Sequence, residues 1–182
     1  MVQSAYLSMR RSGFSLIELM VVIAVAAILL GTGVPFVKNL VHGQRLTTAV
    51  NEFFTSMNLA RAEAIRRGVR IDMVPSSDSG EWEKGWVIFV DEDNDQRADS
   101  GEEKIFVHDA VGQGISIKAS LTDTSLPYLA YSGAGRTRTN ASAYAPQFGN
   151  FTFTLEKQVR KIKINFLGRV RVCNPEVERS TC

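Results

Sequence analysis

Acidic side chains between residues 91 and 102 have the spacing of a calcium-binding loop. Carboxylates stand at positions 1, 3, 5, 9 and 12 of the loop template, and these residues are Asp91, Asp93, Asp95, Asp99 and Glu102. Position 6, where the sharp turn needs glycine, holds Gln96, and the flanking residues have the pattern of strands instead of helices. The alternative is a solvated hairpin loop without metal, so the sequence predicts no resident cofactor and leaves calcium as a candidate.

Basic side chains gather in a later part of the sequence. Between residues 136 and 171 there are eight basic residues and one acidic residue. Alternation of apolar and polar residues over 159–165 places Lys161 and Lys163 on one face of a predicted strand. Arg169 and Arg171 alternate with valines in the same way, which predicts a second strand with its cations on one face.

A hairpin would bring these cations together. If residues 166–168 form a three-residue loop with glycine at its left-handed position, Lys163 lies opposite Arg171. Like charges directly opposite destabilise paired strands by about 0.2–1 kcal/mol, whereas a polyanion relieves their repulsion and releases its counterions. The hypothesis is sequence-independent binding of the DNA backbone by Lys161, Lys163, Arg169, Arg171, Arg136 and Arg138. The alternative is that these cations only solubilise and protect exposed strands.

The sequence contains no catalytic constellation. His108 adjoins Asp109, but no G-x-S-x-G nucleophile motif, P-loop or dinucleotide-binding fingerprint accompanies the pair. His108 has the position of a strand-end residue, and His42 that of a solvated helix residue. We therefore predict that the chain is not an enzyme.

The N-terminal stretch combines basic residues with a long apolar run. Two arginines precede Gly13, and the run from Phe14 to Val34 contains one carboxylate, Glu18. About 20 helical residues span the ~30 Å hydrocarbon core of a bilayer, so residues 14–34 predict a transmembrane helix with the arginines on its cytoplasmic side. A signal peptide is the alternative; the length of the run, the carboxylate and the absence of an obvious cleavage pattern speak against it.

The segment Gly13-Phe14-Ser15-Leu16-Ile17-Glu18 resembles the prepilin peptidase site of type IV pilins and type II secretion pseudopilins. The resemblance implies a leader of residues 1–13, started at Met1 or Met9, which a prepilin peptidase removes on the cytoplasmic side. It also implies N-methylation of Phe14 and a role for Glu18 in assembly with other pilins or pseudopilins. The physical reason is that this carboxylate can neutralise the new amine of Phe14 on a neighbouring helix.

A second, exposed half of the helix is predicted over residues 35–67. An apolar stripe recurs at helical spacing and consists of Phe53, Met57, Ala60 and Ala64, widened by Phe54 and Ile65. Gly68 is the expected end of this helix, because it follows two arginines that suit the negative end of the helix dipole.

Short strands are predicted after Gly68. They cover residues 69–73, 86–90, 104–107, 115–118 and 151–155, followed by the basic hairpin. Residues 131–149 are rich in Ser, Gly, Ala, Thr and Asn and predict a long loop. The expected fold is α+β and type IV pilin-like, with a long N-terminal helix packed on a head of antiparallel strands, residues 68–182.

The head is similar to the GspH/FimT branch of minor pilins and pseudopilins. A tryptophan-led strand that runs into acidic residues and the segment Gly168-Arg169-Val170-Arg171-Val172-Cys173-Asn174 carry the resemblance. It implies a single-pass protein of the bacterial inner membrane with a periplasmic head, which primes or caps a pilus or pseudopilus. Some FimT proteins bind DNA during natural transformation through arginines in this region. A minor pilin, a secretion pseudopilin and a solitary membrane-anchored domain remain the three interpretations.

Cys173 and Cys182 are the only cysteines. An even pair in an oxidising periplasm predicts a disulfide, which contributes roughly 2–3 kcal/mol when it closes so short a loop. Two free thiols are the alternative. A structural zinc site needs four ligands, and both histidines lie far away in the sequence.

Overall fold

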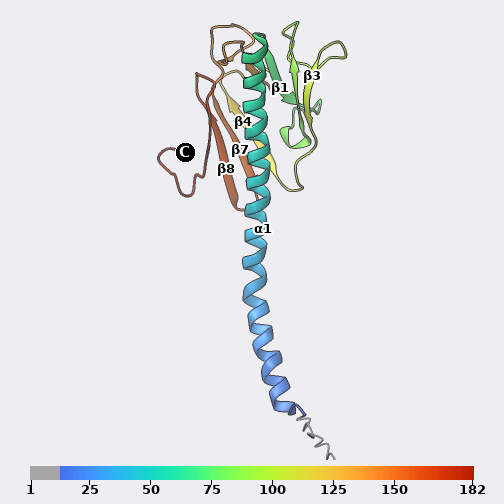
Figure 1. The fold of residues 1–182 in the computed structure, drawn as a ribbon. Helices are drawn as coiled ribbons and strands as arrows, with labels where there is room; N and C mark the ends of the chain where they lie inside the picture. The colour runs from blue at the N-terminus through green and yellow to red at the C-terminus, as the bar shows by residue number, and fades with distance from the viewer. Residues whose placement is uncertain (1–12) are drawn as a thin grey trace, which may run out of the picture. The chain divides into compact units, whose positions relative to one another are not determined.

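A computed structural model describes residues 13–182, except for the side chains of residues 32–36 (Figure 1). The predicted leader lies outside the described residues apart from Gly13. The chain divides into two compact units, of which one ends at Leu40 and the other comprises Val41–Cys182. Each unit is described by itself below.

The helix α1 comprises Leu16–Arg67. Ser15 caps its beginning, because its hydroxyl accepts a hydrogen bond of 3.3 Å from the backbone N–H of Glu18. The helix ends as predicted at Gly68, which has a φ of +71° and donates its N–H to the carbonyl of Ala64. Arg66 in the last turn complements the negative end of the helix dipole.

The large apolar side chains that the structure describes in the first unit are exposed. From Phe14 to Leu30 every large apolar side chain is at least half exposed. Among the residues described with side chains, no helix combines the length and the apolar character that a bilayer crossing needs. Residues 32–34 of the predicted transmembrane segment lie outside those residues.

The second unit buries the predicted stripe of α1. Phe53, Met57, Ala60 and Ala64 are all fully buried, which confirms the helical period that the sequence predicts. Ile65 is 53% exposed, so the expectation that it widens the stripe is wrong.

Two antiparallel sheets cover this stripe. The first has the order β3-β2-β1-β5-β6 and the second the order β4-β7-β8-β9. Figure 1 shows β7 and β8 on one side of the helix and β1 and β3 on the other. The strands are β1 (Ile71–Pro75), β2 (Trp86–Val90), β3 (Lys104–His108), β4 (Ser116–Leu121), β5 (Leu129–Tyr131), β6 (Thr137–Arg138), β7 (Gly149–Leu155), β8 (Gln158–Ile164) and β9 (Val170–Cys173).

Phe53 lies at the centre of the core between the two sheets. Its ring centroid is 4.8 Å from those of Trp86 on β2 and Phe151 on β7. It is 5.4 Å from those of Phe153, also on β7, and Trp82, which lies in the short 3-10 helix η1 (Trp82–Lys84). Several of these contacts are edge-to-face, a favourable geometry for aromatic rings.

The predicted loop over residues 131–149 is only partly a loop. The last residue of β5 and all of β6 fall within it, and β5 pairs with β1 so that Tyr131 lies opposite Ile71. All three residues of β5 are buried, so the strand shows no alternation of apolar and polar residues. Tertiary pairing therefore determines this element, and local pattern does not reveal it.

We expect Phe53→Ala to lower the free energy of unfolding by about 3–5 kcal/mol, because it leaves a cavity among four aromatic rings. Chemical denaturation of the full chain in detergent, followed by the fluorescence of Trp82 and Trp86, measures this change. Ile65→Ala on the exposed side of the same helix is the control and should cost less than about 1 kcal/mol. Equal effects of the two substitutions would contradict the assigned core.

Candidate nucleic-acid interface

The predicted basic hairpin is present. Strands β8 and β9 pair antiparallel, with Lys163 directly opposite Arg171. The connecting turn is the predicted three-residue loop: the N–H of Asn165 donates to the carbonyl of Arg169, and Gly168 has a φ of +76°. Both the register and the special backbone position were therefore correctly predicted from the sequence.

The hairpin presents its basic side chains on the face of the sheet away from the core. Ile162 and Ile164 are buried beneath, whereas Lys161 and Lys163 are partly exposed. Thr152 on β7 lies opposite Lys161, so polar side chains extend this face across the sheet. The alternation along β8 thus separates a core face from a basic face.

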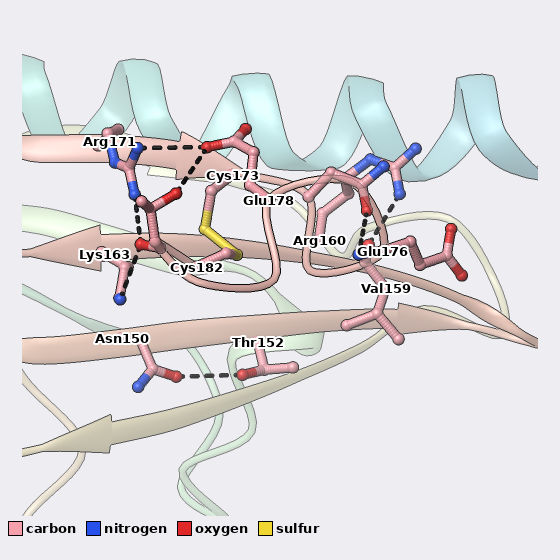
Figure 2. Close-up of a disulfide and its surroundings, with 12 residues drawn as sticks. Asn150, Thr152, Val159, Arg160, Lys163, Arg171, Cys173, Glu176, Glu178 and Cys182 are labelled. Atoms are coloured by element: carbon pink, nitrogen blue, oxygen red, sulfur yellow. Dashed lines mark hydrogen bonds and ion pairs between the residues drawn. A yellow bond between two sulfur atoms is a disulfide. The ribbon is translucent and has the colours of Figure 1, made fainter.

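A disulfide fixes the C-terminal tail over part of the basic face. Cys173 and Cys182 are joined as predicted, with their Cα atoms 5.7 Å apart. Arg171 forms an ion pair with Glu178, in which the nitrogen and oxygen are 3.2 Å apart (Figure 2). Arg171 and Lys163 both donate hydrogen bonds to the carbonyl of Thr181.

These tail contacts change the electrostatic argument for DNA. The sequence suggested that a polyanion relieves the repulsion between Lys163 and Arg171. In the structure the tail supplies that relief, because the side chain of Glu178 and the carbonyl of Thr181 satisfy the facing cations. Among the described residues, the side chains of Arg169 and Lys161 form no ion pair, so these cations are free to meet an anion.

Arg136 lies beside the loop of the hairpin, and its part in a DNA-binding patch stays a prediction. It belongs to the turn between β5 and β6, in which the N–H of Ser132 donates to the Arg136 carbonyl at 2.8 Å. This turn packs against the hairpin loop so closely that a Cβ on Gly168 would lie 2.8 Å from the Gly135 carbonyl oxygen. Arg136 and Phe166 consequently line the same surface pocket.

Arg138 occupies a different environment from the other predicted cations. It is half-buried on β6, beside the charged side chains of Arg70, Asp72 and Asp91. Burial lowers the pKa of Arg138, and the positive charge of Arg70 lowers it further. The structure therefore assigns Arg138 to an internal cluster of charges.

The acidic loop brings three of its five candidate ligands together. The carboxylate oxygens of Asp91, Asp93 and Asp95 lie within 4.8 Å of one another, and Asp99 and Glu102 are not part of this group. Asp91 is buried and forms an ion pair with Arg70, the nitrogen and oxygen being 3.0 Å apart.

The loop is also closed by its own hydrogen bonds. Both carboxylate oxygens of Glu102 accept backbone N–H groups, from Glu92 and Asp99. Gln96 adopts a φ of +63° at the position where a calcium loop needs glycine. The hydrogen bonds of Glu102 close the loop within the protein itself. Calcium binding stays a prediction.

Arg70 faces two buried carboxylates at the base of this loop. It donates two hydrogen bonds to Asp72, of 2.7 and 2.6 Å, besides its ion pair with Asp91. Burial raises the pKa of Asp72 to about 7 against the opposing effect of Arg70, and the charge of Asp91 adds to the rise. Burial is the main cause of the rise, so Asp72 keeps its proton until the pH approaches about 7.

His108 ends β3, as predicted. Its ring stacks on Trp86 with centroids 4.0 Å apart, and its Nε2 lies 3.6 Å from a carboxylate oxygen of Glu52. The ring thus joins the edge strand to α1, which is a structural role.

Two aromatic residues at the interface were missed in the sequence. Tyr144 is 97% exposed and Phe166 is 59% exposed, and both line the pocket that contains Arg136. Phe166 stood in the predicted hairpin loop, and Tyr144 stood alone among small residues. An aromatic residue in a turn or among small residues, outside any apolar period, was the available signal.

The long N-terminal helix and the head of two antiparallel sheets together have the type IV pilin-like fold. The chain matches the family Type II transport protein GspH over residues 49–168, and the prokaryotic N-terminal methylation motif over residues 8–34. The chain belongs to the GspH family. Pilins and pseudopilins are structural, non-enzymatic proteins.

The chain also resembles individual proteins in sequence or in fold. Pilin-like protein PilA1 of Thermus thermophilus is 32% identical over 106 residues, which cover 58% of this chain and 64% of that protein. The type IV minor pilin FimU of Pseudomonas aeruginosa PAO1 has a similar fold, with a TM-score of 0.56, 18% identity and coverage of 73% of this chain and 91% of that one. The minor pseudopilin EpsH of Vibrio cholerae gives a TM-score of 0.51, 13% identity and coverage of 72% and 98%.

The retained proton of Asp72 predicts a pH-dependent stability. The folded pKa of Asp72, about 7, lies above its ordinary value of 3.8, so between these two pH values the folded state binds a proton that the unfolded state releases. This proton stabilises the fold at low pH, and the stabilisation is lost as the pH rises through 7. Relative to Asp72→Asn, the free energy of unfolding of the natural chain should fall by about 1–3 kcal/mol between pH 5 and pH 8.

Denaturant titrations of both chains at several pH values measure this difference. Asp78→Asn, at an exposed carboxylate, is the matched control and should leave the pH profile of the natural chain unchanged. Parallel profiles for the natural chain and Asp72→Asn would contradict the retained proton.

Proposed function

We propose that the chain is a minor type IV pilin, held in the bacterial inner membrane by its N-terminal helix before it enters a pilus. The observation that carries this proposal is the exposed apolar run from Phe14 to Leu30, which contains one carboxylate. Water is an unfavourable environment for so much apolar surface, whereas lipid or the helices of other subunits would cover it. The periplasmic head then consists of the two sheets and the second half of the helix.

Glu18 gives this assembly its specificity. Cleavage by a prepilin peptidase after Gly13 would leave a positive, N-methylated amine on Phe14. A carboxylate among apolar helices needs a partner, because its burial without one costs several kcal/mol. The amine of a neighbouring subunit is the partner that the processing reaction creates, so processing and assembly are coupled.

DNA binding is the second part of the proposal. Arg169, Lys161 and Arg136 supply positive charge that no acidic group of the described chain neutralises. They suit the phosphates of DNA regardless of base sequence, because the interface contains no helix that could enter a groove and read bases. This chemistry favours a pilus that takes up DNA in natural transformation over a type II secretion pseudopilus, which supports protein export.

We expect Glu18→Gln to reduce incorporation of the subunit into filaments more than tenfold, because the amine of Phe14 would be buried without a partner at a cost of about 3–5 kcal/mol. Immunoblots of sheared filaments measure incorporation, and mass spectrometry of the membrane-extracted chain checks that Phe14 is still processed and methylated. The control is Glu92→Gln in the head, which should assemble normally. Normal incorporation of Glu18→Gln with correct processing would refute the pairing.

We expect Arg169→Gln to weaken binding of duplex DNA and to reduce the slope of log K against log salt by about 0.9, the loss of one phosphate contact. Fluorescence anisotropy with the full chain in detergent measures both quantities. Lys104→Gln removes the same charge from the distant edge strand β3 and should change neither. Glu178→Gln should strengthen binding, because it releases Arg171 from its ion pair. Unchanged binding by Arg169→Gln would overturn the role of the hairpin.

A further inference from the structure

A surface pocket of about 450 Å³ lies where the hairpin loop meets the turn between β5 and β6. Phe166 enters it from the hairpin loop, Arg136 from the turn, and Tyr144 and Pro146 from the segment before β7. Two aromatic rings and a guanidinium therefore converge from three separate stretches of the chain.

The two aromatic side chains contribute little to the fold. Tyr144 is 97% exposed and Phe166 is 59% exposed, and neither is part of the buried core. Single exposed apolar residues are common on protein surfaces, but a pair of rings that line one pocket beside an arginine is a more specific arrangement.

The electrostatic environment of the pocket is positive. Of the residues that line it, Arg136 is the only charged one, and none is acidic. Arg169 follows the hairpin loop directly and is exposed, and its guanidinium forms no ion pair among the described residues. A ligand that complements this surface has an aromatic or flat apolar part and a negative charge close to it.

We infer that this pocket binds an unpaired base of single-stranded DNA, stacked on Tyr144 and Phe166, while the adjacent phosphates contact Arg136 and Arg169. The inference rests on the proposed DNA binding and deepens it by naming the form of DNA. Stacking on aromatic side chains tolerates every base, because each base has a π-face, and a positive groove follows the backbone. A base inside a duplex is covered by its neighbours, so the pocket selects single strands and frayed ends.

The test compares a 15-nucleotide single strand with a duplex of equal length, by fluorescence anisotropy with the full chain in detergent. Tyr144→Ala and Phe166→Ala should each weaken binding of the single strand about 5- to 100-fold and change duplex binding less than twofold. Tyr144→Phe keeps the ring and should retain binding of the single strand. Phe106→Ala is the matched control, because it removes an exposed ring from β3 at the opposite edge of the first sheet.

A second measurement detects the stacking itself. A single strand that contains 5-iododeoxyuridine crosslinks under ultraviolet light to an aromatic ring stacked on it. Mass spectrometry should locate the crosslink on the peptide with Tyr144 or on the peptide with Phe166. A crosslink only at other positions would overturn the inference.

The outcomes separate this inference from the proposal on which it rests. If the natural chain binds neither form of DNA, the proposed DNA binding fails and the pocket inference fails with it. If it binds duplex and Tyr144→Ala leaves single-strand affinity within twofold, only the pocket inference is overturned. Loss of filament incorporation by Tyr144→Ala with unchanged DNA affinity would instead make the pocket a contact between subunits, which also overturns it.

Discussion

The burial of one stripe of α1 is the constraint on which the rest of the head depends. Phe53 and its neighbours on the stripe contact both sheets, so the inner faces of all the long strands are committed to the core. The outer face of the first sheet is covered by a second buried cluster, so the outer face of the second sheet, the edge strands and the turns remain exposed. The basic face of β8 is therefore a consequence of how Ile162 and Ile164 pack, because alternation turns every second side chain outward.

Local patterns in the sequence predicted the elements that local physics determines. The helical stripe, the end of α1 at Gly68 and the register of the C-terminal hairpin follow from periodicity and from single glycines with a positive φ. Strand β5 could not be found in this way, because its three residues are all buried and its pairing partner β1 is remote in the sequence. Pairing of this kind depends on the assembled fold.

Within the candidate site, too, some features follow from local sequence patterns and others depend on the assembled fold. The cations of β8 and β9 were predicted because they alternate with apolar residues, but the ion pair between Arg171 and Glu178 depends on the path of the tail. Arg136 and Arg138 are two residues apart and have different surroundings, one exposed in a turn and the other beside buried charges. Proximity in the sequence says little about the electrostatic environment once the chain turns.

Two close contacts hold the loops around the pocket in place. At Gly168 the hairpin loop and the turn between β5 and β6 approach so closely that any larger residue would collide with the Gly135 carbonyl. Arg70 donates hydrogen bonds to Asn94 and to Asn140, so it joins the acidic loop to the segment that carries Tyr144. Neither contact involves a residue that lines the pocket, but each lies close in the sequence to one that does. The rings of Tyr144 and Phe166 therefore remain exposed, whereas the neighbouring backbone is held by the buried Gly168 and Arg70.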